Sequence, residues 1–123
     1  MLTRRERTLL QTTCIFCNIA QGQPPADIIY QDDQVFVIKD IAPKAPTHLL
    51  VIPLSHVTKA ADLEIDDSPM IAAMFEAVTA MVLQEGIENK GYRLIINQGV
   101  DAGQVVDHLH MHILAGKKLP EMG

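Results

Sequence analysis

The stretch VVDHLHMHIL, residues 105–114, places three histidines at two-residue spacing near the end of the chain. A two-residue repeat puts side chains on one face only in an extended strand, whereas on a helix the same residues would scatter. We therefore predict a strand in which His108, His110 and His112 share the more open face. The alternate positions give this strand a largely apolar second face that packs on a core: Asp107, Leu109, Met111 and Ile113.

Composition limits the kind of protein that this chain can be. It has 123 residues, of which 48% are hydrophobic, and a formal net charge of −5. This length predicts a single domain over residues 13–123 after a polar, flexible leader at 1–12. The acidic balance argues against a nucleic acid partner, whose affinity comes from clustered Lys and Arg. No apolar run approaches the ~20 residues that cross a membrane, and no secretory signal is apparent, so we expect a cytoplasmic protein.

Four further segments carry the β-branched, aromatic or apolar residues of strands: residues 28–30, 35–38, 48–53 and 92–97. The polar pair Asp32 and Asp33 between the first two predicts a hairpin. Pro53 is expected to end the third, because proline has no backbone N–H for the next rung of a sheet. Short loops between consecutive strands favour an antiparallel sheet.

One strong helix is predicted between the third and fourth of these segments. Ser68 suits the N-cap, Pro69 the first helical position, and Gly86 the residue just past the end. Its apolar stripe is expected to pack on one face of the sheet: Ile71, Met74, Phe75, Val78, Met81 and Val82. A shorter helical turn in FCNIAQG, residues 16–22, ends at Gly22. The predicted fold class is α+β.

Three functions are compatible with the histidine face. The imidazoles could hold a catalytic zinc, the middle one could attack phosphorus, or the face could be a solvated polar surface. The loop before the histidines favours attack on phosphorus, because Gly99, Gly103 and Gln104 could bring N–H donors close to a phosphate. Glycine pairs are also common loop punctuation, so this loop alone does not decide.

Cys14 and Cys17 form a CxxC pair. In a reducing compartment this spacing indicates a metal or redox pair rather than a structural disulfide. Two small thiols packed in a core are the alternative. The pair indicates a metal site only if further ligands converge on it.

The segment HLHMHIL matches the signature His-φ-His-φ-His-φ-φ, in which φ is apolar, of the histidine triad (HIT) family. Together with DDQVFVIKDIAPKAPTHLLVIP, NKGYRLIINQG and AGQVVDHLHMHILAG, it makes the chain resemble the Hint-type branch from Cys14 to about Gly116. The resemblance implies a five-stranded antiparallel sheet with one main helix and a short N-terminal helix. It also implies a homodimer with one continuous sheet, and hydrolysis of purine nucleoside phosphoramidates of AMP or GMP that requires no cofactor.

The resemblance also implies a role for each site residue. His110 would attack the α-phosphorus and form a nucleotidyl-histidine intermediate. His112, supported by His48, would supply a proton to the leaving group, while His108 would orient the phosphate site. Asp40 would bind the ribose. Phosphate and leaving-group contacts would come from Asn97, Gly103, Gln104 and the Val105 N–H. The apolar slot for the base would be formed by Phe16, Ile19, Ile38 and Ile41.

Bacterial members of the family with CxxC at this place bind zinc, which implies a structural zinc ligated by Cys14, Cys17, His56 and His108. Val105 stands where many Hint-type members have Ser, so a hydroxyl contact to phosphate is absent. The tail LPEMG also lacks the aromatic residue that some members extend across the dimer. Three alternatives stay open: dinucleoside polyphosphate hydrolysis, a nucleotide-binding scaffold with incidental activity, and a zinc hydrolase that uses the triad as its metal ligands.

Overall fold

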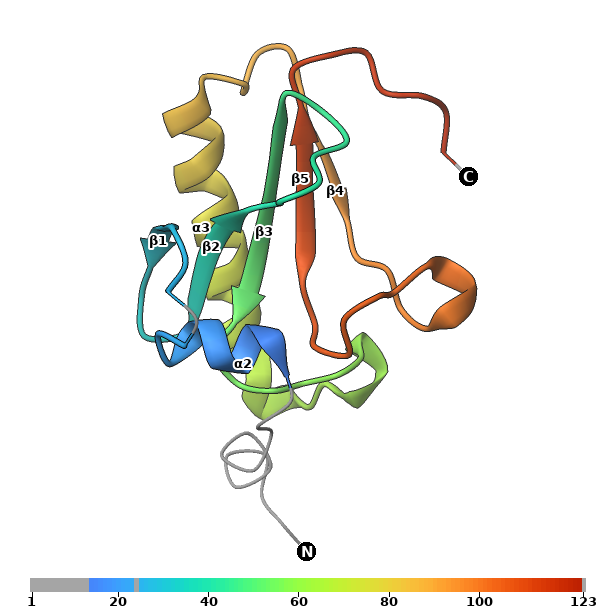
Figure 1. The fold of residues 1–123 in the computed structure, drawn as a ribbon. Helices are drawn as coiled ribbons and strands as arrows, with labels where there is room; N and C mark the ends of the chain where they lie inside the picture. The colour runs from blue at the N-terminus through green and yellow to red at the C-terminus, as the bar shows by residue number, and fades with distance from the viewer. Residues whose placement is uncertain (1–13, 24, 123) are drawn as a thin grey trace, which may run out of the picture.

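Five strands form one antiparallel sheet in the order β1-β2-β3-β5-β4 (Figure 1). The structure, a computed structural model, describes residues 14–23 and 25–122, so the predicted leader at 1–12 lies outside the described residues. The strands occupy the predicted segments: β1 Ile28–Gln31, β2 Val35–Lys39, β3 Thr47–Pro53, β4 Arg93–Ile95 and β5 Met111–Ala115. The antiparallel sheet and the α+β class are therefore confirmed.

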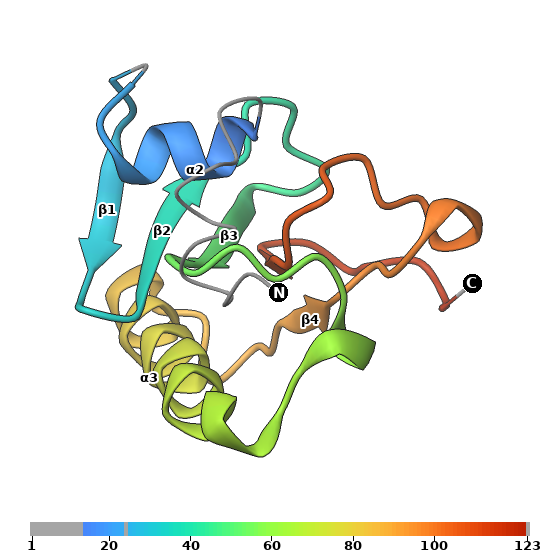
Figure 2. The same cartoon turned by 90° about the horizontal axis from the view of Figure 1, so that it is seen from below.

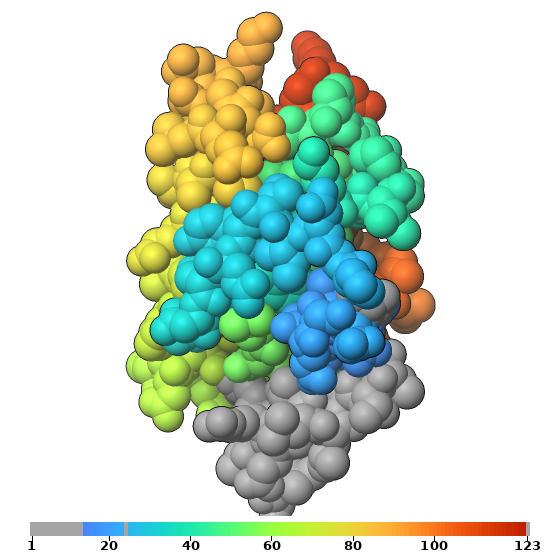
Figure 3. Space-filling view, turned by 60° about the vertical axis from the view of Figure 1, so that its left-hand side comes forward, coloured from blue at the N-terminus to red at the C-terminus, as the bar shows by residue number. Residues whose placement is uncertain are grey.

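Two α-helices, α2 (Ile15–Ala20) and α3 (Ser68–Glu85), lie on opposite faces of the sheet (Figure 2). Three short 3₁₀ turns connect the other elements: η1 Ala60–Asp62, η2 Ile65–Asp67 and η3 Val100–Ala102. In Figure 3 the β1–β2 hairpin (cyan) forms one side of the molecule, with α3 (yellow) beside it. Within the described residues, no helix is long and apolar enough to cross a membrane.

Each face of the sheet has its own core. On the α3 side, alternate residues of β2, β3 and β5 pack with the helix, among them Val37, Val51 and Ile113. On the α2 side, Phe36 and Ile52 pack with the short helix. Because β2 and β3 are covered on both faces, their sequences are continuous apolar runs rather than alternating ones.

Helix α3 departs from its predicted boundaries and stripe in two places. Its N-cap is Asp67, and Ser68 is already helical, with its hydroxyl donating to the Ile65 carbonyl at 2.6 Å. Phe75 is 51% exposed, so its place in the predicted stripe was wrong. The sheet instead receives Ala73 and Ala77 beside the predicted methionines and valines, because small side chains let the helix approach closely. The left-handed Gly86, at φ 66°, ends the helix as predicted.

The histidine segment is also corrected in two respects. β5 begins only at Met111, which pairs with Val51, because β3 ends at Pro53 and offers no further ladder. The alternation of faces nevertheless extends upstream, with Leu109 buried on the α3 side. The histidine face is not open: His108 is fully buried and His110 is 7% exposed, because α2 covers them.

Candidate active site and candidate metal centre

A cavity of about 580 Å³ lies on the α2 side of the sheet. Its walls come from α2, the segment that follows β2, strand β4 and the loop that leads into β5. It brings together three predicted catalytic residues, His48, His110 and His112. It also gathers nearly all the predicted nucleotide contacts: Phe16, Ile19, Ile38, Asp40, Ile41, Asn97, Gly103 and Val105. Two of these, Ile41 and Val105, are highly exposed at its rim.

One hydrogen bond fixes the tautomer of His110. Its Nδ1–H donates to the backbone carbonyl of His108 at 2.7 Å. This leaves Nε2, with its lone pair, as the nitrogen available to the cavity that His110 lines. The ring of Phe16 holds it edge-on, with 5.1 Å between the ring centroids. The neutral His110 ring therefore has the tautomer and the fixed orientation that a nucleophile needs.

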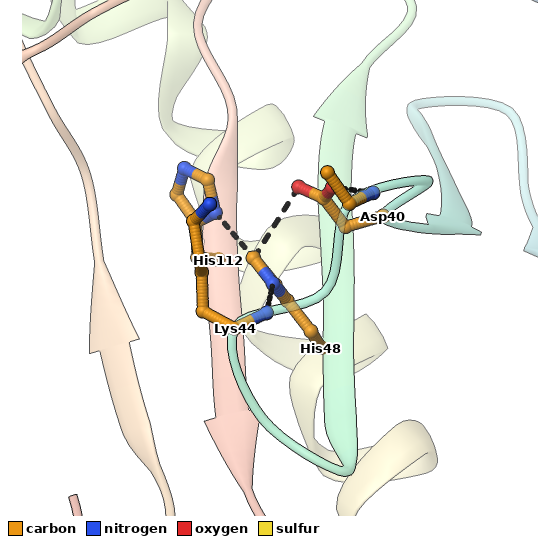
Figure 4. A network of polar contacts seen from close by, with 5 residues as sticks. Asp40, Lys44, His48 and His112 are labelled. Atoms are coloured by element: carbon orange, nitrogen blue, oxygen red, sulfur yellow. Dashed lines mark hydrogen bonds and ion pairs between the residues drawn. The ribbon is translucent and has the colours of Figure 1, made fainter.

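A second chain of hydrogen bonds fixes His48 and His112 (Figure 4). The Lys44 backbone N–H donates to Nδ1 of His48 at 3.0 Å, so the proton of the neutral His48 ring is on Nε2. This Nε2–H lies 2.8 Å from Nδ1 of His112 and 3.4 Å from Oδ2 of Asp40. Nδ1 of His112 is thus the acceptor, and its own proton resides on Nε2.

The pKa values of these two imidazoles favour the same neutral forms. Burial, followed by the charges of His110 and His48, lowers the pKa of His112 to about 4. Burial also lowers the pKa of His48, against an opposing pull from Asp40. Both rings are therefore neutral near pH 7, and His112 presents an N–H donor rather than a cation.

The side chains of Asp40 and Gln104 also form hydrogen bonds that fix nearby backbone segments. Oδ1 of Asp40 accepts from the Ala42 N–H at 2.8 Å, which shapes the turn after β2. Gln104 does not line the cavity, because its side chain is used inside its own loop. It accepts from the Gly99 N–H at 2.8 Å and donates to the carbonyls of Thr58 and Val106 at 3.1 and 3.2 Å. These three hydrogen bonds fix the conformation of the loop before β5 and attach it to the segment that contains Thr58.

Several residues of the cavity wall were missed from the sequence: Ile15, Lys39, Ala42, Lys44, Leu50, Ile95, Val106 and Leu114. Strand register would have found two of them, because Leu50 and Ile95 flank His112 on the neighbouring strands. Lys44 had no such signal, since it lies in a loop whose path is set by tertiary packing.

A second cluster joins the CxxC pair to two histidines. Nδ1 of His108 lies 3.3 Å from Sγ of Cys14 and 3.6 Å from Sγ of Cys17, and Nδ1 of His56 lies 3.2 Å from Sγ of Cys17. His108 donates from Nε2 to the Pro53 carbonyl at 2.8 Å, which leaves Nδ1 with a lone pair toward the thiols. The four donor atoms all lie within 4.8 Å of one another.

This donor set fits zinc. Two thiols and two imidazole nitrogens are a common tetrahedral zinc set, and both cysteines are free of disulfides. Burial, together with Cys14, raises the pKa of the Cys17 thiol to about 12, and burial lowers the pKa of His108 to about 4. A divalent cation would offset the cost of a buried thiolate, while the neutral imidazole is already in its ligating form.

The triad histidines therefore divide between two sites. His108 contacts the cysteines and does not line the cavity, so only its backbone carbonyl reaches the catalytic group, through His110. The three imidazoles do not converge on one metal, contrary to the zinc-hydrolase alternative. Asp40, His48 and His112 also lie close together, but their facing atoms are already engaged with one another.

Comparison with known proteins identifies the family. Residues 21–119 match the HIT domain family, and the chain belongs to it. The purine nucleoside phosphoramidase of Escherichia coli strain K12 is 41% identical over 108 residues, which cover 88% of this chain and 91% of that protein. The crystal structure of a HIT family hydrolase from Legionella pneumophila is similar, with a TM-score of 0.84 and 39% identity over 87% of this chain and 96% of that one.

A third similar structure contains zinc. A zinc-bound histidine triad family protein from Mycobacterium smegmatis has a TM-score of 0.72 and 32% identity, over 85% of this chain and 76% of that one. These similarities confirm the predicted family and the predicted hydrolase class.

Proposed function

We propose that the protein hydrolyses purine nucleoside 5′-phosphoramidates, in which AMP or GMP is joined through nitrogen to an amine. The observation that carries this proposal is the tautomer of His110, whose Nδ1–H is bound to a carbonyl, so that the neutral ring has its lone pair on Nε2 in the cavity. An unprotonated, immobile imidazole nitrogen is suited to attack phosphorus. The similarity to the E. coli purine nucleoside phosphoramidase supports the choice of substrate.

In the first step Nε2 of His110 attacks the α-phosphorus, the P–N bond breaks, and its electron pair leaves with the amine. The leaving nitrogen takes a proton from Nε2 of His112. As Nε2 gives up its proton, a proton from solvent replaces it, so His112 and His48 stay neutral and keep the hydrogen bond of 2.8 Å between Nδ1 of His112 and Nε2 of His48. The nucleotidylated His110 ring carries the positive charge at the end of this step.

In the second step a water molecule attacks the nucleotidyl-histidine. Its attack releases the nucleotide, restores the neutral His110 ring, and sends the proton of the water to solvent through the His48–His112 pair. The same hydrogen-bonded pair therefore serves both halves of the reaction, and no metal takes part in either step.

The residues that line the cavity suit the base, the ribose and the phosphate of a nucleotide in turn. Phe16, Ile19 and Ile38 form an apolar wall that suits a purine, with Ile41 at the rim. Asp40 stands at the end of β2, where a carboxylate oxygen can accept from ribose hydroxyls. Asn97, Gly103 and the backbone N–H of Val105 surround the place assigned to the phosphate.

The proposed cofactor is one structural zinc, held by Cys14, Cys17, His56 and His108. When bound, it would contribute folding free energy by tying the start of α2 to the segment that precedes β5. The chain's own part is to fix Nδ1 of His108 as a ligand through the bond to Pro53. The zinc-bound relative from M. smegmatis supports this proposal.

The proposed setting is a cytoplasmic homodimer with no nucleic acid or membrane partner. Two free cysteines at a candidate zinc site suit a reducing compartment. Strand β4 lies at the edge of the described sheet, and an edge strand can pair through its backbone with a second copy. Analytical ultracentrifugation would test the dimer, and a sedimentation mass of one chain at micromolar concentration would refute it.

The test of the function uses an AMP phosphoramidate with a fluorogenic amine. Wild type is expected to release the amine, and samples quenched at alkaline pH, where a P–N bond to histidine survives, are expected to show an AMP adduct on His110 by mass spectrometry. The His110→Ala variant should bind AMP but release no amine. Absence of release by wild type on AMP and GMP amidates, with cleavage of dinucleoside polyphosphates instead, would replace this function by the alternative one.

A further inference from the structure

Lys44 lines the cavity beside the two imidazoles of the proton chain. Its backbone N–H fixes His48, and its positive charge is among the causes that lower the pKa of His48. Figure 4 shows its side chain extending from the loop on the His112 side of this pair. The ammonium group therefore belongs to the cavity, and the proposed chemistry has not used it.

Ring contacts of His112 with its two neighbouring imidazoles relate Lys44 to the proposed reaction. His110 and His112 are 5.1 Å apart between ring centroids, and His112 and His48 are also 5.1 Å apart. The backbone N–H of Lys44 donates to His48, and its side chain extends on the His112 side of the pair (Figure 4). Because His112 faces the leaving nitrogen in the proposed reaction, Lys44 lies on the side from which the amine departs.

Positive charge is concentrated at this end of the sheet, although the chain as a whole carries −5. The pairing of Thr47 with Ala115 brings the start of β3 beside the end of β5. The cations around this point are Lys39 and Lys44 in the cavity wall, Arg93 opposite Leu114, and Lys117 and Lys118 after β5. Asp40 is the only carboxylate among the described residues that line the cavity, and it is already engaged by Ala42 and His48.

We propose that Lys44 selects phosphoramidates whose amine carries a carboxylate, as in an amino acid joined to the nucleotide through nitrogen. This inference rests on the proposed function and narrows its substrate class. The α-phosphate already has proposed donors in Asn97, the Val105 N–H and His112, which line the same cavity as His110. A lysine ammonium on a flexible stem is suited to a carboxylate whose distance from phosphorus varies among amines.

The test compares two amidates of AMP that differ in one group, the β-alanine adduct and its neutral β-alaninamide counterpart. The ratio of kcat/KM for acid over amide is measured in wild type and in Lys44→Gln, which keeps the backbone N–H to His48. The ratio is expected to fall about fivefold, the size of one partly exposed charge pair. Lys44→Arg should keep most of the preference, and Lys90→Gln, which removes an exposed charge outside the cavity, should leave it unchanged.

An unchanged ratio in Lys44→Gln would overturn the proposal. If kcat/KM for both amidates fell by the same factor, Lys44 would contact a group that the two share, such as the phosphate. Binding provides a readout that does not need turnover. In the His110→Ala background, calorimetry should show that Lys44→Gln weakens the acid amidate about fivefold more than the amide. If wild type cleaves neither amidate, the proposed function fails, and this difference in binding still decides for or against Lys44.

Discussion

His108 and His110 lie two residues apart on one extended segment, and their imidazoles have opposite tautomers. His108 donates from Nε2 to the Pro53 carbonyl, which leaves Nδ1 for the two thiols. His110 donates from Nδ1 to the His108 carbonyl, which leaves Nε2 for the cavity. A backbone carbonyl thus decides which nitrogen of each ring is free. The comparison teaches that identical side chains on one face become a metal ligand or a nucleophile through their carbonyl partner.

The two surroundings also differ in polarity. His108 is fully buried beside the two cysteines and Phe16, and it does not line the cavity. His110 borders a cavity that can hold a nucleotide. The first environment suits structural ligation, and the second suits chemistry on a bound molecule.

The largest expected effect tests whether His108 and His110 have different roles, by removing each imidazole separately. His110→Ala is expected to lower amidate hydrolysis about 10⁴-fold, because the attacking atom is lost. Its free energy of unfolding should change far less than that of His108→Ala, which loses a buried ring bonded to Pro53. Steady-state kinetics and urea unfolding of both variants measure this. Comparable loss of activity by His110→Ala and a mutant of an exposed residue such as Glu121→Ala would contradict the assignment.

Metal removal should act on stability rather than on the chemical step. Chelation of zinc-loaded protein is expected to lower the free energy of unfolding by about 3 kcal/mol, as loss of a ligand present at a hundred times its Kd would. At a temperature where the chelated protein stays folded, kcat should change little. Cys17→Ser is the control, since its unfolding should no longer respond to chelator. Immediate loss of kcat in folded, chelated protein would instead place the metal in the reaction.

The sheet could be predicted from the sequence because its strands depend on local alternation of apolar residues and on the positions of proline and glycine. Alternation correctly put Leu109, Met111 and Ile113 on the core face. It could not show that His108 and His110 are covered, because the cover is α2, a segment some ninety residues earlier in the chain. The prediction that Phe75 faces the sheet was wrong for a similar reason. The buried face of α3 includes Ala73 and Ala77, and which helical positions face the sheet depends on tertiary packing.

The residues of the candidate site likewise fall into those that local motifs predicted and those whose contacts depend on distant parts of the chain. The resemblance placed nearly every predicted contact at the cavity, because the motifs carry the site as a set. It also gave His108 a place at the phosphate, whereas its ring lies with the cysteines. Gln104 was expected at the phosphate as well, but its side-chain amide is hydrogen-bonded to three backbone groups, the Gly99 N–H and the carbonyls of Thr58 and Val106. Such hydrogen bonds follow from the folded path of the loop and leave no mark in the sequence.

The next effect in size is the dependence of stability on pH. The pKa of His112 falls from the ordinary 6.5 to about 4, so the unfolded chain binds this proton more readily than the folded one. The stabilisation is complete above pH 6.5 and is lost as the pH falls toward 4. Between pH 7 and pH 5 it should decrease by about 2 kcal/mol.

Urea unfolding across this range measures the slope, and His112→Gln is the matched variant because it removes only this imidazole. His108 titrates in the same direction, so the variant should keep part of the dependence while losing the share of His112. Identical slopes in the two proteins would mean that His112 is not held neutral by the fold.

The smallest expected effect concerns Phe16, which belongs to both regions. It lies between Cys14 and Cys17 in α2, and its ring meets His110 and His108 edge-on at 5.1 and 5.7 Å between centroids. It also lines the cavity. If ligation by the two cysteines holds this ring in place, AMP should bind a few-fold more tightly to zinc-loaded than to chelated protein, a coupling of about 1 kcal/mol.

Phe16→Leu keeps an apolar side chain but removes the aromatic edge contacts, so this coupling should vanish while AMP still binds. Calorimetry of both proteins, each with and without zinc, gives the four affinities of the cycle. The same zinc dependence in Phe16→Leu would mean that the two regions communicate through the His108 carbonyl instead. Equal affinities in zinc-loaded and chelated wild type would mean that they share a strand but act independently.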